Sequence, residues 1–246
     1  MKKGILIFGA VVIVLIAMRA HSKILGQQKE TLQAQAKMEQ RLVSLEKENK
    51  NLTAELKKIK SAIHFDELTE DFSRAYGIDI AHSPILGRKD APITIVEFVD
   101  LQCPYCSRFH PIVLDAQKAF PDKVNVVLKN FPLPFHSQAI PAAKAAFAAG
   151  EQGKYWEMVD ALLKNSQNLS EKKYRELAGK LGLNVRQFLQ DYKEKDLQWQ
   201  EYIQKDVALG NKSAVRGTPT IYINGRKTQA RDLEGFKDEI KGYLHS

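Results

Sequence analysis

The chain has only two cysteines, Cys103 and Cys106, and they stand in the segment Cys-Pro-Tyr-Cys. A run rich in β-branched and aromatic residues at 93–99 precedes them and predicts a buried strand, whereas residues 108–120 predict a helix. We therefore expect Cys103 at a strand-to-helix junction. The free N–H groups and positive dipole end of a starting helix stabilise a thiolate, the form of cysteine that attacks disulfides. The spacing places Cys106 one turn away, where it can displace a mixed disulfide on Cys103.

Three other roles for the cysteine pair remain open at this point. A structural disulfide would close a loop of only two residues, which removes little entropy from the unfolded chain. A zinc site needs more ligands than Cys103, Cys106 and His110 supply, and the sequence has no second cysteine pair. A copper-handling pair is harder to exclude. We favour redox catalysis by the cysteines, with no metal and no cofactor.

Composition narrows the class of protein. The chain is 44% apolar and 27% charged, which is ordinary for a globular protein and excludes a disordered one. Its net charge of +8 comes from 37 Lys and Arg against 29 Asp and Glu, and the basic residues are spread along the sequence. A nucleic-acid surface requires basic clusters interleaved with aromatic residues. We therefore expect no nucleic-acid partner.

Residues 1–20 predict an N-terminal signal or membrane anchor. Lys2 and Lys3 precede fifteen apolar or small residues, Gly4 to Met18, and Arg19 ends the run. At about 1.5 Å per residue such a helix spans roughly 22 Å of a hydrocarbon core of about 30 Å, a shortness typical of a cleaved signal peptide. The density of Ile, Val and Leu and the lack of a clean cleavage site favour an uncleaved anchor instead. Either alternative places the cysteines in the periplasm or another exported compartment, where disulfides persist.

Residues 21–64 predict a helical coiled-coil stalk, because they contain no Pro and no Gly after Gly26. From Met38 onward the apolar residues alternate between spacings of three and four, which is a heptad pattern. The a positions are Leu42, Asn49, Leu56 and Ile63, and the d positions are Met38, Leu45, Leu52 and Ile59. The predicted oligomerisation residues are Leu42, Leu45, Asn49, Leu52, Leu56 and Ile59.

The single polar a position, Asn49, predicts a parallel homodimer. A buried Asn at a is satisfied only by the matching Asn of a partner helix, so it selects register and two-stranded pairing. Arg41 would face Glu46 of the partner, and Glu55 would face Lys60, both with opposite charge. A trimer, or a single amphipathic helix packed on its own catalytic domain, are the alternatives.

Beyond the stalk, residues 65–90 read as a connector, in which a short helix around Asp66 to Tyr76 is expected. Residues 91–246 form the predicted catalytic domain. Its second strand is expected at 124–131, followed by a helical insertion at about 137–212, whose helices begin in part behind the caps Ser170 and Asn184. A hairpin over 220–228, turning at Asn224-Gly225, and a helix over 233–244 complete it.

From about Ser83 to its end, the chain resembles the exported DsbA-like branch of the thioredoxin fold. Three motifs in a fixed order carry the resemblance: Gly87 to Pro92 leading into ITIVEF, the CPYC segment, and VRGTPTIYINGR from Val215 to Arg226. The resemblance implies an α/β thioredoxin-like fold with an inserted helical domain, here preceded by a long helical stalk. Stalk-bearing relatives are dimeric or trimeric disulfide isomerases and reductases.

The resemblance also implies roles for individual residues. Cys103 matches the attacking cysteine and Cys106 the resolving one, so that Cys103-Cys106 is the redox disulfide. Pro219 matches the cis-proline beside the active site, where the backbone of Thr218 is free to pair with a substrate peptide.

Glu97 matches a buried acidic residue that assists proton transfer at the resolving cysteine; the alternative is a solvent-facing Glu on an edge strand. Pro104 and Tyr105 are expected to tune the thiolate and to contact the substrate. His110 is expected to be an ordinary helix residue.

The function expected from these observations is that of an exported thiol–disulfide oxidoreductase. It would form, reduce or isomerise disulfides in cysteine-containing client proteins, as a stalk-linked dimer served by a membrane redox partner that reoxidises or reduces it. Pro-Tyr between the cysteines and Thr218 before Pro219 resemble the isomerase side of the family. The alternative is a non-catalytic dimeric chaperone or copper-binding module that uses the same groove.

Overall fold

The computed structural model describes residues 2–62 and 70–245, and for 2–17, 19–20, 24, 57 and 59–62 it describes the backbone alone. The chain divides into two compact units, Met1–Glu70 and Asp71–Ser246, which are treated separately below.

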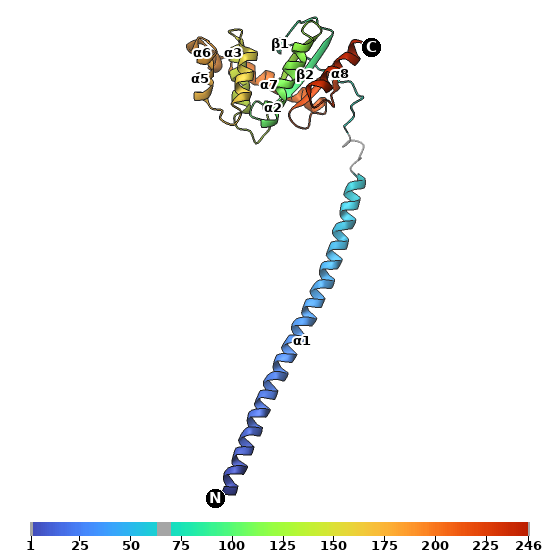
Figure 1. Cartoon of the computed structure of the whole chain (residues 1–246), viewed down its shortest axis with the longest axis vertical. Helices are drawn as coiled ribbons and strands as arrows, with labels where there is room; N and C mark the ends of the chain where they lie inside the picture. Colours follow the sequence, from blue (N-terminus) through green and yellow to red (C-terminus); the bar gives the residue numbers. More distant parts are fainter. Residues whose placement is uncertain (1, 63–69, 246) are drawn as a thin grey trace. The chain divides into compact units, whose positions relative to one another are not determined.

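The first unit is a single long helix, α1 (Lys2–Ala62), drawn in blue to cyan in Figure 1. The side chains of Met38, Leu42, Leu45, Leu52 and Leu56 are between 46% and 67% exposed in the single chain. A stripe of exposed apolar side chains along a helix, interrupted here by Asn49, is typical of a surface that packs against another helix. Of the other two predicted oligomerisation residues, Asn49 is exposed, and the side chain of Ile59 lies outside the description, as does the whole of Ile63.

Among the residues whose side chains are described, no helix is long and apolar enough to cross a membrane. Apart from Met18, the side chains of the predicted anchor at 1–20 lie outside that set.

The connector does not contain the expected helix in its described part. Residues 70–76 are non-helical, and residues 66–69 lie outside the description. Asp71 accepts hydrogen bonds from the backbone N–H and the hydroxyl of Ser73, a local turn that competes with a helix. Ala75 then forms a β-bridge with Arg226, and the N–H of Tyr76 donates to the Gly225 carbonyl at 2.8 Å. Tertiary pairing with the hairpin therefore sets the conformation of this segment.

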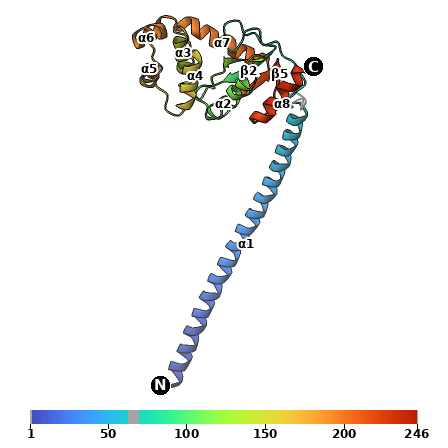
Figure 2. The same ribbon diagram turned by 45° about the horizontal axis from the view of Figure 1, so that its top comes forward.

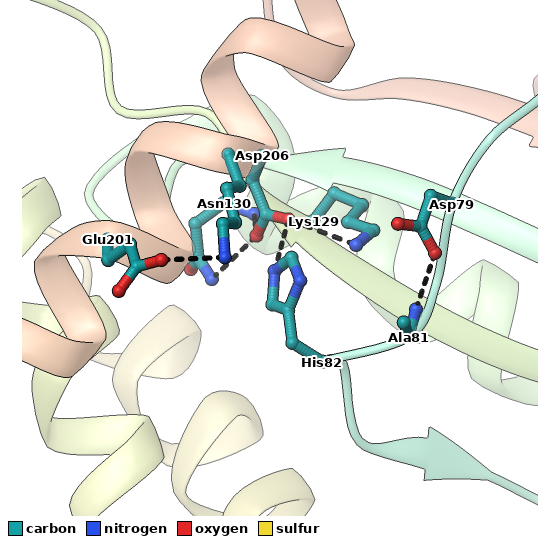
Figure 3. Close-up of polar contacts among 8 residues, drawn as sticks. Asp79, Ala81, His82, Lys129, Asn130, Glu201 and Asp206 are labelled. Atoms are coloured by element: carbon teal, nitrogen blue, oxygen red, sulfur yellow. Dashed lines mark hydrogen bonds and ion pairs between the residues drawn. The ribbon is translucent and has the colours of Figure 1, made fainter.

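A buried carboxylate holds the end of the connector. Asp206 lies 2.8 Å from His82 Nε2 and 3.1 Å from the buried Lys129 Nζ, and it accepts the N–H of Asn130 at 2.9 Å (Figure 3). The His82 ring stacks on Tyr202, with 4.8 Å between ring centroids. One side chain of α7 (Asp196–Lys212) thus joins the connector to the end of the strand at Val124–Asn130.

The second unit contains a mixed sheet, five-stranded in the described residues, with the order β1-β3-β2-β4-β5. The strands are β1 (Ile85–Leu86), β2 (Ile93–Val99), β3 (Val124–Asn130), β4 (Thr220–Ile223) and β5 (Arg226–Lys227). β2 runs parallel to β3 and antiparallel to β4, so it is central. Its continuous apolar run is typical of a strand covered on both faces. Only the short β1 was not predicted from the sequence.

Alternate residues of β2 face different layers, as the two-residue period of a strand requires. Ile93 and Ile95 pack with Val113 of α2 (Pro104–Ala119) and Phe236 of α8 (Leu233–Leu244). On the opposite face, a second cluster is formed by Val96, Phe98, Val127, Val215 and Tyr222, against which Tyr76, Ile78 and Ile80 of the connector pack. Glu97 shares the side of Ile93 and Ile95, and therefore faces α2.

The helical insertion lies between β3 and β4. It consists of α3 (Ala139–Gly150), α4 (Tyr155–Lys164), α5 (Glu171–Lys180), α6 (Val185–Glu194) and α7 (Asp196–Lys212). Figures 1 and 2 show α3, α5 and α6 together at one end of this unit and α8 at the other. As predicted, Ser170 and Asn184 cap α5 and α6 by accepting the N–H groups of Lys173 and Gln187. The predicted helix from Val185 breaks at Lys195 into α6 and α7.

The hairpin turn gives a test of how the connector is held. Gly225 has φ +80°, and a Cβ there would lie 2.4 Å from the Tyr76 carbonyl oxygen. Gly153 has φ +73°, with no atom within 4 Å of such a Cβ. We expect Gly153→Ala to lower the free energy of unfolding by roughly 1–2 kcal/mol, the cost of left-handed backbone. Gly225→Ala should cost clearly more, because the connector must also move. Urea denaturation measures both, and equal losses would contradict the proposed contact.

Candidate active site

Cys103 lies where the sequence predicts, at the junction of β2 and α2. Cys103 is the N-cap of α2, with extended backbone (φ −73°, ψ 124°), and Pro104 opens the helix. The residue is 3% exposed, Cys106 is fully buried one turn later, and both carry free thiols. The fold therefore presents one sulfur at the helix start and encloses the other.

The turn that leads into Cys103 is organised by Asp100, which the sequence reading did not identify. Its carboxylate accepts the N–H of Gln102 at 2.8 Å and that of Leu133 at 2.8 Å, and it contacts His136 Nδ1 at 2.8 Å. The Asp100 carbonyl accepts the N–H of Cys103 at 2.9 Å. An Asp immediately after a strand that bonds to the backbone two residues later is a common turn signal, and it could have indicated this role.

Thr218 and Pro219 lie beside Cys103, across the site from the helix. The Thr218-Pro219 peptide bond is cis, as the resemblance implied. Cys103 Sγ donates to the Thr218 carbonyl at 3.5 Å. Thr218 Oγ1 is buried and has no hydrogen-bond partner within the described residues, which leaves it available to a thiolate. Four of the predicted site residues thus come together, namely Cys103, Cys106, Thr218 and Pro219.

Pro104 and Tyr105 form the exposed rim of the site. Tyr105 is 60% exposed, and the Arg108 guanidinium lies over its ring, 4.7 Å from the centroid. Beside them is a pocket of about 380 Å³, lined by Pro104, Ser107, Arg108 and residues 164–168.

The two thiols have opposite acidities. The pKa of Cys103 is lowered to about 5, chiefly because the Cys106 thiol donates a hydrogen bond to the Cys103 thiolate. Burial opposes this, whereas the N–H groups of Cys106 and Tyr105 and the Thr218 hydroxyl add to it. Burial raises the pKa of Cys106, and the neighbouring Cys103 raises it further. One thiol is thus ionised at neutral pH and the other stays protonated.

Glu97 is buried, so the alternative of a solvent-facing carboxylate on an edge strand is wrong. It is 0% exposed on the central strand β2, and its Oε2 lies 2.8 Å from His110 Nδ1. His110 lies on helix α2 as expected, and there it is 1% exposed and contacts this carboxylate. The four-residue spacing from Cys106 could have indicated a shared helix face.

Elsewhere, no set of three or more His, Cys, Asp and Glu side chains in the described part of the chain is arranged to hold a metal ion.

Comparison with known proteins places this site in a family. A family model described as thioredoxin matches residues 80–242. The chain belongs to the thioredoxin family. Within that family its fold is that of the DsbA-type proteins. The structure of BdbD from Bacillus subtilis is 25% identical, with a TM-score of 0.60 over 70% of this chain and 98% of that one.

Two further solved structures of this fold are similar. The thiol-disulfide exchange protein alpha-DsbA2 from Wolbachia pipientis is 19% identical, with a TM-score of 0.60 over 66% of this chain and 87% of that one. A thioredoxin-like oxidoreductase from Silicibacter pomeroyi is 26% identical, with a TM-score of 0.58 over 71% and 96%.

The curated proteins with a similar sequence match this chain over only part of their own length. The Na(+)/H(+) antiporter NhaA 1 of Mycolicibacterium gilvum is 32% identical over 151 residues, which are 61% of this chain and 24% of the antiporter. NhaA 3 of Salinispora tropica is 35% identical over 151 residues, 23% of its length. The chain thus spans about a quarter of the length of these relatives.

The ionisation of Cys103 can be measured directly. We expect the thiolate absorbance of the reduced protein near 240 nm to appear with a midpoint at about pH 5. Cys106→Ala removes the largest cause of the low pKa, so the midpoint should rise in that variant. Because the folded pKa lies below that of an unfolded thiol, about 8.5, ionisation stabilises the folded reduced protein fully above that pH. This stabilisation is lost as the pH falls through about 5. A wild-type midpoint near 8.5 would contradict the assigned geometry.

Proposed function

We propose that the protein is an exported thiol–disulfide oxidoreductase that acts on cysteine-containing client proteins through Cys103 and Cys106. One observation carries the proposal: a sulfur of low pKa stands at a helix start beside Thr218, with a buried, protonated sulfur one turn behind it. The solved structures of thiol-disulfide exchange proteins and oxidoreductases with this fold support it.

The chemistry follows from this division of labour. The Cys103 thiolate attacks a client disulfide, one client sulfur leaves as a thiolate, and the other remains bonded to Cys103. Cys106 then loses its proton and its sulfur attacks Cys103 Sγ. The bond between Cys103 and the client breaks, the client sulfur leaves with the electron pair, and the Cys103-Cys106 disulfide forms. Two electrons have passed from the protein to the client, and a redox partner must restore the dithiol.

We further propose that the protein works mainly as an isomerase. An isomerase must present a free thiolate to the client disulfide, and the low pKa of Cys103 supplies one at neutral pH. In isomerisation a client thiol, not Cys106, attacks the mixed disulfide, which regenerates the Cys103 thiolate with no net oxidation. Two catalytic units held by one parallel coiled coil would raise the local concentration of active sites around a misfolded client. The exposed leucine stripe of α1 supports such pairing.

The cysteine roles are tested by two substitutions. We expect Cys103→Ser to abolish disulfide exchange, because the remaining thiol is buried and protonated. Cys106→Ala should instead accumulate mixed disulfides between Cys103 and client proteins, because nothing displaces the client. Alkylation trapping followed by mass spectrometry identifies the bonded cysteine. Clients trapped on Cys106 would reverse the assignment, and absence of exchange by the wild type would favour a chaperone or copper-binding module.

The role of the stalk is tested by its removal. We expect deletion of residues 1–64 to give a monomer that reduces a small disulfide at the wild-type rate but loses most isomerase activity on a scrambled protein. Analytical ultracentrifugation and a scrambled-ribonuclease assay measure these two properties. If the monomer isomerises the scrambled protein as fast as the full chain does, the stalk is only a spacer and the isomerase proposal is contradicted.

A point variant separates pairing from length. Asn49→Leu should leave α1 helical but loosen its oligomeric state, because the polar a position no longer penalises other pairings. Asn51→Leu, at an outward heptad position, is the matched control and should leave the state unchanged.

A further inference from the structure

A buried acid–base pair lies behind the resolving cysteine. Cys106 and His110 are four residues apart on the buried face of α2, so they lie one turn from each other. Glu97 faces the same helix from β2 and contacts His110 at 2.8 Å. The exposed fractions of the His110 and Glu97 side chains are 1% and 0%. The negative charge of Glu97 is close enough to Cys106 to raise the pKa of that thiol.

Two atoms of this pair stand out. Oε1 of Glu97 and Nε2 of His110 are both buried and have no hydrogen-bond partner among the described residues. Nearly all buried polar groups in native proteins are hydrogen-bonded, so each exception needs an explanation. Glu97 uses one oxygen for His110 and keeps the other free, and its charge acts on the Cys106 thiol, the group that must give up a proton in the resolving step.

We propose that His110 is a positioning residue for the resolving step: its Nδ1–H holds Oε2 of Glu97, so that Oε1 stays free to accept the proton of Cys106. The inference rests on the proposed oxidoreductase function. It assigns to His110 a role of its own, one that neither the cysteines nor the family motif specifies.

The surroundings of His110 fit this role. Its ring lies parallel to Trp156 of α4, with 6.3 Å between ring centroids and 3° between planes, a contact that restricts the plane of the imidazole, while the hydrogen bond to Glu97 sets the direction of Nδ1. The charged groups that face the ring are Glu97 from β2, and Asp160 and Lys164 from α4. Burial lowers the pKa of His110, but the charge and hydrogen bond of Glu97 outweigh it, and the net change is upward.

The step balances as follows. The Cys106 thiol transfers its proton to Oε1 of Glu97, and the sulfur attacks Cys103 Sγ in the mixed disulfide. The client sulfur leaves with the electron pair of the broken bond. His110 occupies Oε2 through its Nδ1–H, so that of the two carboxylate oxygens Oε1 is the one left to take the proton.

The experiment separates the two steps of a single turnover. The probe is a peptide disulfide whose halves carry different fluorophores, mixed with the reduced full-length protein in a stopped-flow instrument. Release of the first half reports attack by Cys103, and release of the second half reports attack by Cys106. We expect His110→Phe, which keeps a ring against Trp156, to slow only the second release, by roughly 10- to 100-fold at pH 7. The pH midpoint of that release should move upward.

Two more variants test the hydrogen-bond donor, His110 Nδ1–H, and the proposed base, Glu97. His110→Asn places an amide N–H near the position of Nδ1 and should restore part of the rate. Glu97→Gln should slow the second release at least as much as His110→Phe and remove the dependence of its rate on the protonation of the carboxylate.

The matched control is His82→Phe, the same change at a histidine that also contacts a buried carboxylate, Asp206 (Figure 3). It reports the stability cost of losing such a contact and should leave both releases unchanged. If His110→Phe slows neither release, or slows both equally with an unchanged pH midpoint, His110 serves packing alone and the inference is overturned. If the wild type releases neither half, the oxidoreductase function itself fails.

Discussion

The site depends on keeping one negative charge on the sulfur at the start of α2 while a second sulfur, one helical turn further along, remains protonated. Each thiol enforces the state of the other, because the proton on Cys106 is the donor that stabilises the Cys103 thiolate. Removing that proton destroys both conditions together. In the proposed exchange a base must therefore act on Cys106 only after Cys103 has bonded to a client and no longer carries charge.

In the second unit, the sheet and the helix α2 place a carboxylate that could serve as this base near Cys106. The parallel pairing of β2 with β3 buries β2 on both faces, so a carboxylate on it is removed from water and costs free energy unless it is paired. His110 provides the pairing from α2, and the helical insertion provides Trp156 to orient His110. The insertion thus contributes to the environment of a thiol that lies in the thioredoxin core.

The sequence predicted those parts of the fold that are set locally. The runs 93–99 and 124–131, the Asn224-Gly225 turn and the caps Ser170 and Asn184 were correct, because β-branched runs, turn residues and capping side chains act over a few residues. The expected helix at 66–76 failed in its described part, because residues 75 and 76 pair with the hairpin, about 150 residues away in sequence. Strand β1 has two residues and carries no periodic signal.

The site shows the same division. The cysteines, Thr218 and Pro219 were predicted because their motifs are contiguous in sequence. The contact of Glu97 with His110 was not predicted, because thirteen residues separate them and only the packing of α2 on β2 joins them. The pairing of the stalk stays a prediction from the heptad pattern, because the structure of a single chain shows only that the apolar side chains of α1 are exposed.

The attachment of the connector has a mechanical consequence. A pull on the chain at residue 71 reaches Tyr76, bonded to the hairpin, and then His82, bonded to Asp206, before it reaches the strands that carry the site. Asp206 also holds Lys129 and the N–H of Asn130 at the end of β3. Because these contacts lie in series between residue 71 and the strands, a force applied to the chain there would have to break them before it displaced the cysteines.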